Sequence, residues 1–197
     1  MGASGYRRHR LEISRTQRRY RSPRTPADGI PADPRPIKTA ATDSGVTSVT
    51  KVNFYKVQGD LEAVLALTCR LVERAWQQDT EVLIHTDDEQ TALRLSDTLW
   101  DWSASSFLPH RLQAIGPEKI QIHAGPADTD DVEEIIGEQH GLLVNLAEQT
   151  PRWFARFDIL CEFVHGDEAL LTSKRDRYRF YKDRGYPLQY HDMSERF

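Results

Sequence analysis

Residues 51–100 read KVNFYKVQGDLEAVLALTCRLVERAWQQDTEVLIHTDDEQTALRLSDTLW. The run 81–86 holds three consecutive apolar residues, which is typical of a strand covered by helices on both faces. The segment 51–57 alternates apolar and polar side chains and predicts another strand. A stretch with apolar residues at three- and four-residue spacing follows each strand, and Asp60 and Asp87 are placed to cap these two helices. The order strand, helix, strand, helix predicts an α/β fold with a parallel-rich sheet.

The rest of the chain extends this pattern. The further predicted elements are strands at 120–123, 141–147 and 157–164, a helical turn at 151–155, and a helix at 167–184 that Gly185 ends. We therefore expect one three-layer domain at 50–197, with helices on both sides of the sheet. The fold would be Rossmann-like but without a nucleotide-binding loop, because no glycine lies in a phosphate-binding pattern and the acidic Asp60 begins the first helix.

The N-terminal stretch 1–49 has a different composition, rich in Arg, Pro, Ser and Thr. Residues 1–50 carry ten basic and four acidic side chains, a net charge of +6, whereas 51–197 carry 16 basic and 26 acidic ones, a net charge of −10. Few large apolar residues are available to offset the entropy of ordering, so we predict a disordered leader. It is either an unstructured tail or a stretch translated from a start codon chosen too early. An arginine-rich arm that binds DNA directly is the competing interpretation.

Composition also limits the function classes. The acidic charge of 51–197 excludes a generally basic nucleic-acid binder for the folded part. Cys69 and Cys161 stand alone, without the spacing of a disulfide framework or a zinc site, so we expect no metal and no cofactor. No apolar run approaches the roughly 20 residues of a membrane span. We expect a cytoplasmic protein without membrane contact.

The strongest candidate for an active site is the end of the strand at 81–86. His85 is close in sequence to Asp87 and two further acidic residues, a set that could serve acid–base chemistry or bind a metal. Acidic residues at a helix start are also ordinary, because they complement the helix dipole. A nucleotide- or metal-dependent enzyme that uses His85 and Asp87 is the alternative to a non-catalytic function.

A second unusual segment is the predicted last helix. Between 174 and 184 it concentrates six cations in a region that is otherwise acidic, and helical spacing places Arg175, Arg179 and Lys182 on one face. Such a face suits an acidic peptide. A solvated helix end that complements the dipole is the other interpretation.

Several short stretches together resemble a known family. They are Asn53-Phe54-Tyr55, Val82-Leu83-Ile84, Asp88-Glu89-Gln90 with Ala92 and Arg94-Leu95, Leu99-Trp100, Ser106-Phe107-Leu108-Pro109-His110, and 175–186. In this order they resemble the chi subunit of bacterial DNA polymerase III, over about residues 51–190. Each stretch alone is a weak signal, and the combination is specific.

The resemblance implies a non-catalytic adaptor in DNA replication, an accessory subunit of a DNA-directed DNA polymerase. Such a subunit bridges psi, and through psi the clamp loader, to the acidic C-terminal tail of single-stranded-DNA-binding protein. Its contact with nucleic acid would be indirect. Trp100, Phe107 and Pro109 match the psi-facing positions of the family, and core packing is the other interpretation of these residues.

For the tail site, the resemblance assigns Arg175 as the principal cation and Val164 as part of an apolar pocket. The family has a lysine one helical turn before Arg175, and this chain has Leu171 there. Lys174 and Arg179 are the candidates to replace it. A guanidinium that meets a terminal carboxylate beside a pocket for the last ring is chemically sensible.

Overall fold

The computed structural model describes residues 49–103, 107–113, 116–129, 132–137, 139–166 and 168–193. Apart from Val49, the predicted leader at 1–49 lies outside the described residues, as does the predicted cap of the last helix at Asp167.

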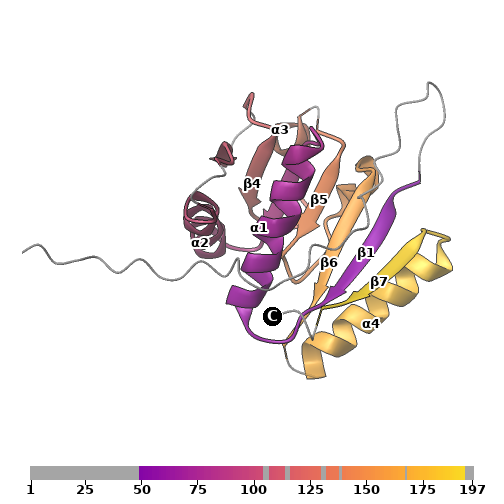
Figure 1. The fold of residues 1–197 in the computed structure, drawn as a ribbon. Helices are drawn as coiled ribbons and strands as arrows, with labels where there is room; N and C mark the ends of the chain where they lie inside the picture. Colours follow the sequence, from indigo (N-terminus) through magenta and orange to yellow (C-terminus); the bar gives the residue numbers. More distant parts are fainter. Residues whose placement is uncertain are drawn as a thin grey trace, which may run out of the picture.

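Seven parallel strands form one sheet in the order β3-β4-β2-β5-β6-β1-β7 (Figure 1). The strands are β1 (Lys51–Lys56), β2 (Val82–Thr86), β3 (His110–Leu112), β4 (Ile120–Ala124), β5 (Leu142–Asn145), β6 (Ile159–Val164) and β7 (Leu188–Asp192). The α/β fold and the parallel sheet predicted from the sequence are confirmed.

Helices cover both faces of this sheet. On one face, α1 (Leu61–Gln77) and α2 (Glu89–Trp100) pack against alternate strand residues such as Val82 and Ile84. On the other face, α3 (Val132–Ile136), the 3-10 helix η1 (Arg152–Arg156) and α4 (Glu168–Asp183) pack against the intervening residues, such as Leu83 and Leu160. The alternation follows from the two-residue period of a strand. Among the described residues, no helix combines the length and apolar character needed to cross a membrane.

The two long helices on the first face begin at aspartates. Asp60 accepts hydrogen bonds from the backbone N–H groups of Glu62 and Ala63, as predicted. The second cap is Asp88, not the predicted Asp87, because the carboxylate of Asp88 lies 2.8 Å from the N–H of Thr91. Asp87 instead accepts from the backbone N–H of Glu148 at 2.6 Å, and so joins the end of β2 to the loop after β5.

The α1 face is the larger apolar interface. Its buried side chains recur at helical spacing and include Leu65, Val72 and Ala75, which are 0–1% exposed. Complete burial of a leucine or valine contributes about 1.5 to 3 kcal/mol relative to exposure. This interface holds α1 across the centre of the sheet, and α2 packs beside it (Figure 1).

Candidate protein-binding surfaces

One exposed cluster lies where α2 ends. Trp100 is 52% exposed and Phe107 is 69% exposed, although both are large and apolar. Their ring centroids are 5.5 Å apart, and the ring of His110 lies 4.7 Å from that of Trp100. We call Trp100, Phe107 and His110 the aromatic patch.

The residues next to the aromatic patch hold it in place. Leu99 and Leu108 are buried, at 1% and 2% exposure, so the neighbouring rings of Trp100 and Phe107 project outward. The ring of His110 is fixed at both nitrogens, because Nδ1 donates to the carbonyl of Leu108 at 2.8 Å and Nε2 lies 2.9 Å from Ser96 Oγ. Core packing in this chain therefore does not account for Trp100 and Phe107. Pro109, the third predicted residue, is half-buried between Leu108 and His110.

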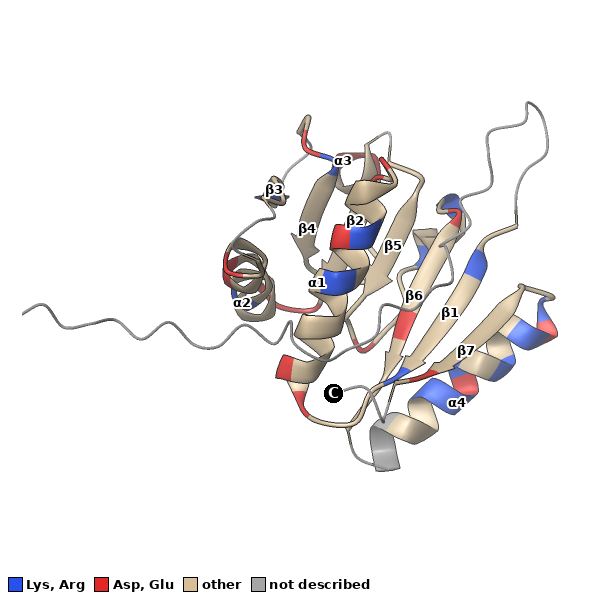
Figure 2. Cartoon of the chain, viewed as in Figure 1, with Lys and Arg blue, Asp and Glu red and all other residues tan. Residues whose placement is uncertain are grey.

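The second surface is α4, along which basic residues gather (Figure 2). Arg175 is exposed, and so is Arg179, which forms an exposed ion pair with Asp176 at 3.1 Å. Tyr178 is 37% exposed and its ring packs 5.4 Å from that of Phe54 on β1. Val164, the predicted pocket residue, is half-buried at the end of β6.

Beneath α4 lies a buried carboxylate that is not among the residues predicted from the sequence. Glu162 on β6 is fully buried and accepts hydrogen bonds from side chains of the sheet, the β5–β6 connection and α4. Its donors are Asn145 at 3.2 Å, Thr150 at 2.6 Å, Lys174 at 3.0 Å, Arg177 at 3.4 Å and Tyr181 at 3.1 Å. We call Glu162 and these donors the Glu162 network.

The network keeps Glu162 ionised in the interior. Burial alone would raise the pKa of this carboxyl, but the charges of Lys174 and Arg177, with the hydrogen bonds of Thr150 and Lys174, lower the pKa below 4.5. Burial and, to a smaller extent, the negative charge of Glu162 raise the pKa of the Tyr181 hydroxyl, which therefore stays protonated as a donor. A buried charge is tolerated only when it is paired in this way.

The network corrects one expectation from the sequence. Lys174 is only 8% exposed and its ammonium faces Glu162, so it does not stand on the outer surface beside Arg175. The physical reason is the helical repeat: Lys174, Arg177 and Tyr181 share the inner side of α4, where a buried carboxylate requires cationic and hydroxyl partners. Arg175, Arg179 and Lys182, which helical spacing predicts on one face, are all exposed.

The two residues of the alternative enzyme site, His85 and Asp87, lie in different environments. His85 is fully buried, with its ring stacked on that of His123 at 5.5 Å and edge-on to Trp153 at 5.4 Å. Asp87 is exposed and bonds to the loop after β5. Within the part of the chain that the structure describes, no group of three or more His, Cys, Asp or Glu residues is arranged to hold a metal ion.

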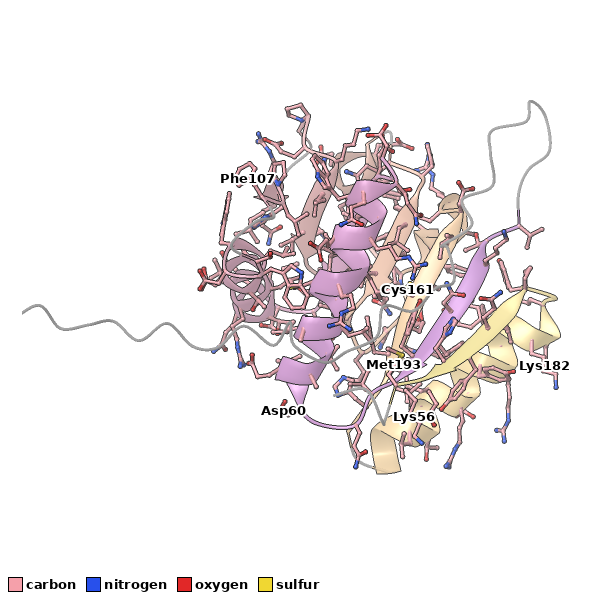
Figure 3. All side chains as sticks on the ribbon, viewed as in Figure 1. Lys56, Asp60, Phe107, Cys161, Lys182 and Met193 are labelled. Carbon is pink, nitrogen blue, oxygen red and sulfur yellow. The ribbon has the colours of Figure 1, made fainter. Side chains whose placement is uncertain are left out.

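The aromatic patch and α4 lie at opposite edges of the sheet. β3, which contains His110 of the patch, is the first strand in the sheet order, whereas α4 packs on β6 and β1 near β7, the last strand. Six strand spacings of about 4.8 Å separate these edges, which is roughly 29 Å. Figure 3 shows Phe107 and Lys182 on opposite sides of the domain. Two proteins could therefore contact the two surfaces at the same time.

Comparison with known proteins gives consistent results. A family model described as DNA polymerase III chi subunit, HolC, matches residues 49–189. The chain is 33% identical over 149 residues to the DNA polymerase III subunit chi of Pseudomonas aeruginosa, covering 74% of this chain and 98% of that protein. It is 29% identical over 140 residues to the Escherichia coli subunit of the same name, covering 68% of this chain and 92% of that protein.

Proposed function

The chain belongs to the DNA polymerase III chi subunit family, and on this premise we propose that it is a non-catalytic adaptor. One surface would bind the psi subunit, and through psi the clamp loader. The other would bind the acidic C-terminal tail of single-stranded-DNA-binding protein. Contact with DNA would then be indirect, through the protein that coats the single strand.

The aromatic patch supports the psi side of this proposal. Trp100 and Phe107 form an exposed apolar surface beside the half-buried Pro109, above the buried Leu99 and Leu108. Exposed aromatic rings of this kind are the usual anchors of protein–protein interfaces, where a few large side chains supply most of the affinity.

The observation that carries the tail side is the outward basic face of α4 on a domain whose charge is otherwise acidic. Arg175 and Arg179 supply guanidinium groups for carboxylates, and the half-buried Val164 supplies apolar surface. Tyr178, which is exposed three residues after Arg175, adds an aromatic surface that the sequence analysis missed. Lys174 is not part of the proposed tail-binding surface, because its side chain belongs to the Glu162 network.

The adaptor would act by effective concentration. Many tails are displayed on one coated single strand, so a weak contact with each tail becomes a strong attachment once psi holds the chain to the clamp loader. The negative charge of the rest of the domain would discourage direct binding to DNA, which keeps the basic face of α4 for short acidic peptides.

The test is a titration of a labelled peptide comprising the last ten or so residues of single-stranded-DNA-binding protein. We expect Arg175→Glu to weaken binding by at least about 30-fold, since losing one member of a partly desolvated charge pair costs about 2 to 5 kcal/mol. Val164→Asp should weaken it similarly by placing a charge in the apolar surface. Affinity should also fall with added salt, because charges are screened over about 8 Å at physiological ionic strength.

The matched control is Arg184→Glu. Arg184 is an exposed cation of the same segment, but its guanidinium lies 3.7 Å over the ring of Phe180, on another side of α4. Arg184→Glu changes the charge by the same amount as Arg175→Glu, but at a position away from the proposed peptide site. This variant should therefore bind the peptide within about threefold of the wild type. Equal affinity of the peptide for the wild type, Arg175→Glu and Val164→Asp would remove this surface from the proposal.

A further inference from the structure

The sheet has an open edge at β7. Among the described residues, β7 pairs only with β1, and the N–H of Val52 on β1 donates to the carbonyl of Pro187 at 2.9 Å. In a parallel ladder, alternate residues of a strand bond to the same neighbour. The odd-numbered residues of β7 therefore face β1. The backbone N–H and C=O groups of Leu188 and Tyr190 point to the open side.

One flank of α4 borders this edge. Arg177 reaches back to β6 through its 3.4 Å contact with Glu162, whereas the next residue, Tyr178, packs against β1. Each residue turns an α-helix by about 100°. Continuing in the direction from Arg177 to Tyr178, the next basic side chains around the helix are those of Lys182 and Arg175. These two exposed cations therefore lie on the side of α4 that faces β7.

An aromatic surface lies between the cations and the edge. Tyr190 is opposite Phe54 in the register of β7 and β1, so both side chains are on the α4 face of the sheet. Tyr190 is 54% exposed, and Tyr178, which packs on the same Phe54, is 37% exposed. The edge thus combines backbone donors and acceptors, exposed rings and positive charge.

We propose that an acidic C-terminal peptide binds here as an eighth parallel strand, paired with Leu188 and Tyr190. This inference rests on the proposed function, because it takes the tail of single-stranded-DNA-binding protein as the occupant. Charge complementarity favours that occupant, since the exposed Arg175 and Lys182 lie on the side of α4 that faces β7. Addition of a strand to an open sheet edge is a general mode of peptide recognition.

The fold also fixes the direction of the peptide. α4 connects two parallel strands, β6 and β7, so it runs antiparallel to them, and Arg175 lies nearer than Lys182 to the carboxyl ends of the strands. A terminal carboxylate at Arg175 therefore requires a peptide that runs parallel to β7. Seven helical residues span about 10 Å, which equals about three residues of a strand. An acidic side chain three residues before the last one would then face Lys182.

Hydrogen exchange followed by NMR on the full chain tests the pairing. With the ten-residue tail peptide bound, we expect the amides of Leu188 and Tyr190 to exchange at least tenfold more slowly, and the effect to vanish in Arg175→Glu. In a second experiment, single residues of the peptide are N-methylated. Binding should weaken at least tenfold at every second position, where the peptide N–H faces β7, and less than threefold at the positions between, where it faces away. A methyl group removes a hydrogen bond only where the N–H faces β7.

Charge exchange tests the direction. Lys182→Glu should weaken binding of the natural peptide at least tenfold, and a peptide with lysine three residues before its end should restore most of the loss. Binding with no protection of Leu188 and Tyr190, or with equal effects of N-methylation at all positions, would overturn strand addition alone. Failure of the peptide to bind the wild-type chain would overturn both this inference and the tail site.

Discussion

Glu162 is a single buried charge on which the placement of α4 depends. Replacement by glutamine would leave Lys174 and Arg177 close together on the interior side of α4 without a counterion. We expect Glu162→Gln to lower the free energy of unfolding by about 3 to 5 kcal/mol, the cost of breaking one side of a buried ion pair. Urea denaturation monitored by fluorescence would measure this loss.

Asp176→Asn provides the control for that substitution, because Asp176 and Arg179 form an ion pair in solvent on the same helix. Exposed pairs contribute little, so this variant should unfold within about 0.5 kcal/mol of the wild type. If Glu162→Gln were equally mild, the network would not anchor α4. The tail peptide should bind more weakly to Glu162→Gln, since the outer face of α4 is positioned through its inner face.

His85 makes the stability depend on pH. Burial, with a smaller contribution from the charge of His123, lowers the pKa of His85 from 6.5 to about 4. Between these values the unfolded chain binds a proton that the folded chain excludes. The free energy of unfolding should therefore fall as the pH drops from 6.5 to 4. His85 accounts for about 3 kcal/mol of this loss at pH 4, and above pH 6.5 it should not contribute to the pH dependence.

The measurement is the free energy of unfolding at several pH values for the wild type and His85→Leu. The substitution should flatten the curve between pH 6.5 and 4, because leucine binds no proton in either state. A wild-type curve and a His85→Leu curve of the same slope would contradict a neutral, buried His85.

Some residues at the candidate surfaces were predictable and others were not. Arg175 and Arg179 follow from helical spacing, and the structure places both on the outside of α4. Lys174 was misassigned because Glu162 lies in a short apolar run, where the sequence analysis recognised only a strand. A signal was present: an acidic residue in a strand covered on both faces requires a cationic partner, and a cation-rich helix follows directly.

At the level of the element, two adjacent residues at the end of α2 have different surroundings: Leu99 lies in the core, and Trp100 lies on the candidate psi-binding surface. We expect Trp100→Ala and Phe107→Ala each to weaken psi binding by about 2 kcal/mol or more, the size of an interfacial hot spot, without loss of fold. Leu99→Ala on the same turn should instead destabilise the domain by about 2 to 5 kcal/mol, because Leu99 is buried. Calorimetric binding and thermal unfolding of the three variants distinguish these outcomes.

Elements with strong periodicity were predicted, and those without it were missed. α1 shows a buried residue on every turn, and β2 is buried at all five positions. By contrast, β3 has three half-buried residues, α3 has five residues in all, and β7 is half-buried or exposed throughout. These three form because neighbouring strands and helices hold them, so their own residues carry little signal.

For the whole molecule, the wide separation of the two surfaces predicts independent binding. The tail peptide should bind the complex of this chain with psi within about twofold of its affinity for the chain alone, since no described element is shared by the aromatic patch and α4. Titration of the labelled peptide at saturating psi measures this. A tenfold change in either direction would show that the surfaces are coupled, by contact or by a change in the sheet.

The position of β1 inside the sheet also has consequences for synthesis. Lys51 pairs with Ile159, and the other neighbour of β1 begins at Leu188, so β1 is made well before β6 and β7, the two strands with which it pairs. Ribosomes add about 5 to 20 residues per second, which leaves β1 without partners for roughly 5 to 20 seconds. During this interval its apolar residues Val52 and Phe54, which are buried in the folded domain, lack their partners and are accessible to chaperones, and synthesis of β6 and β7 sets the moment at which the sheet can close.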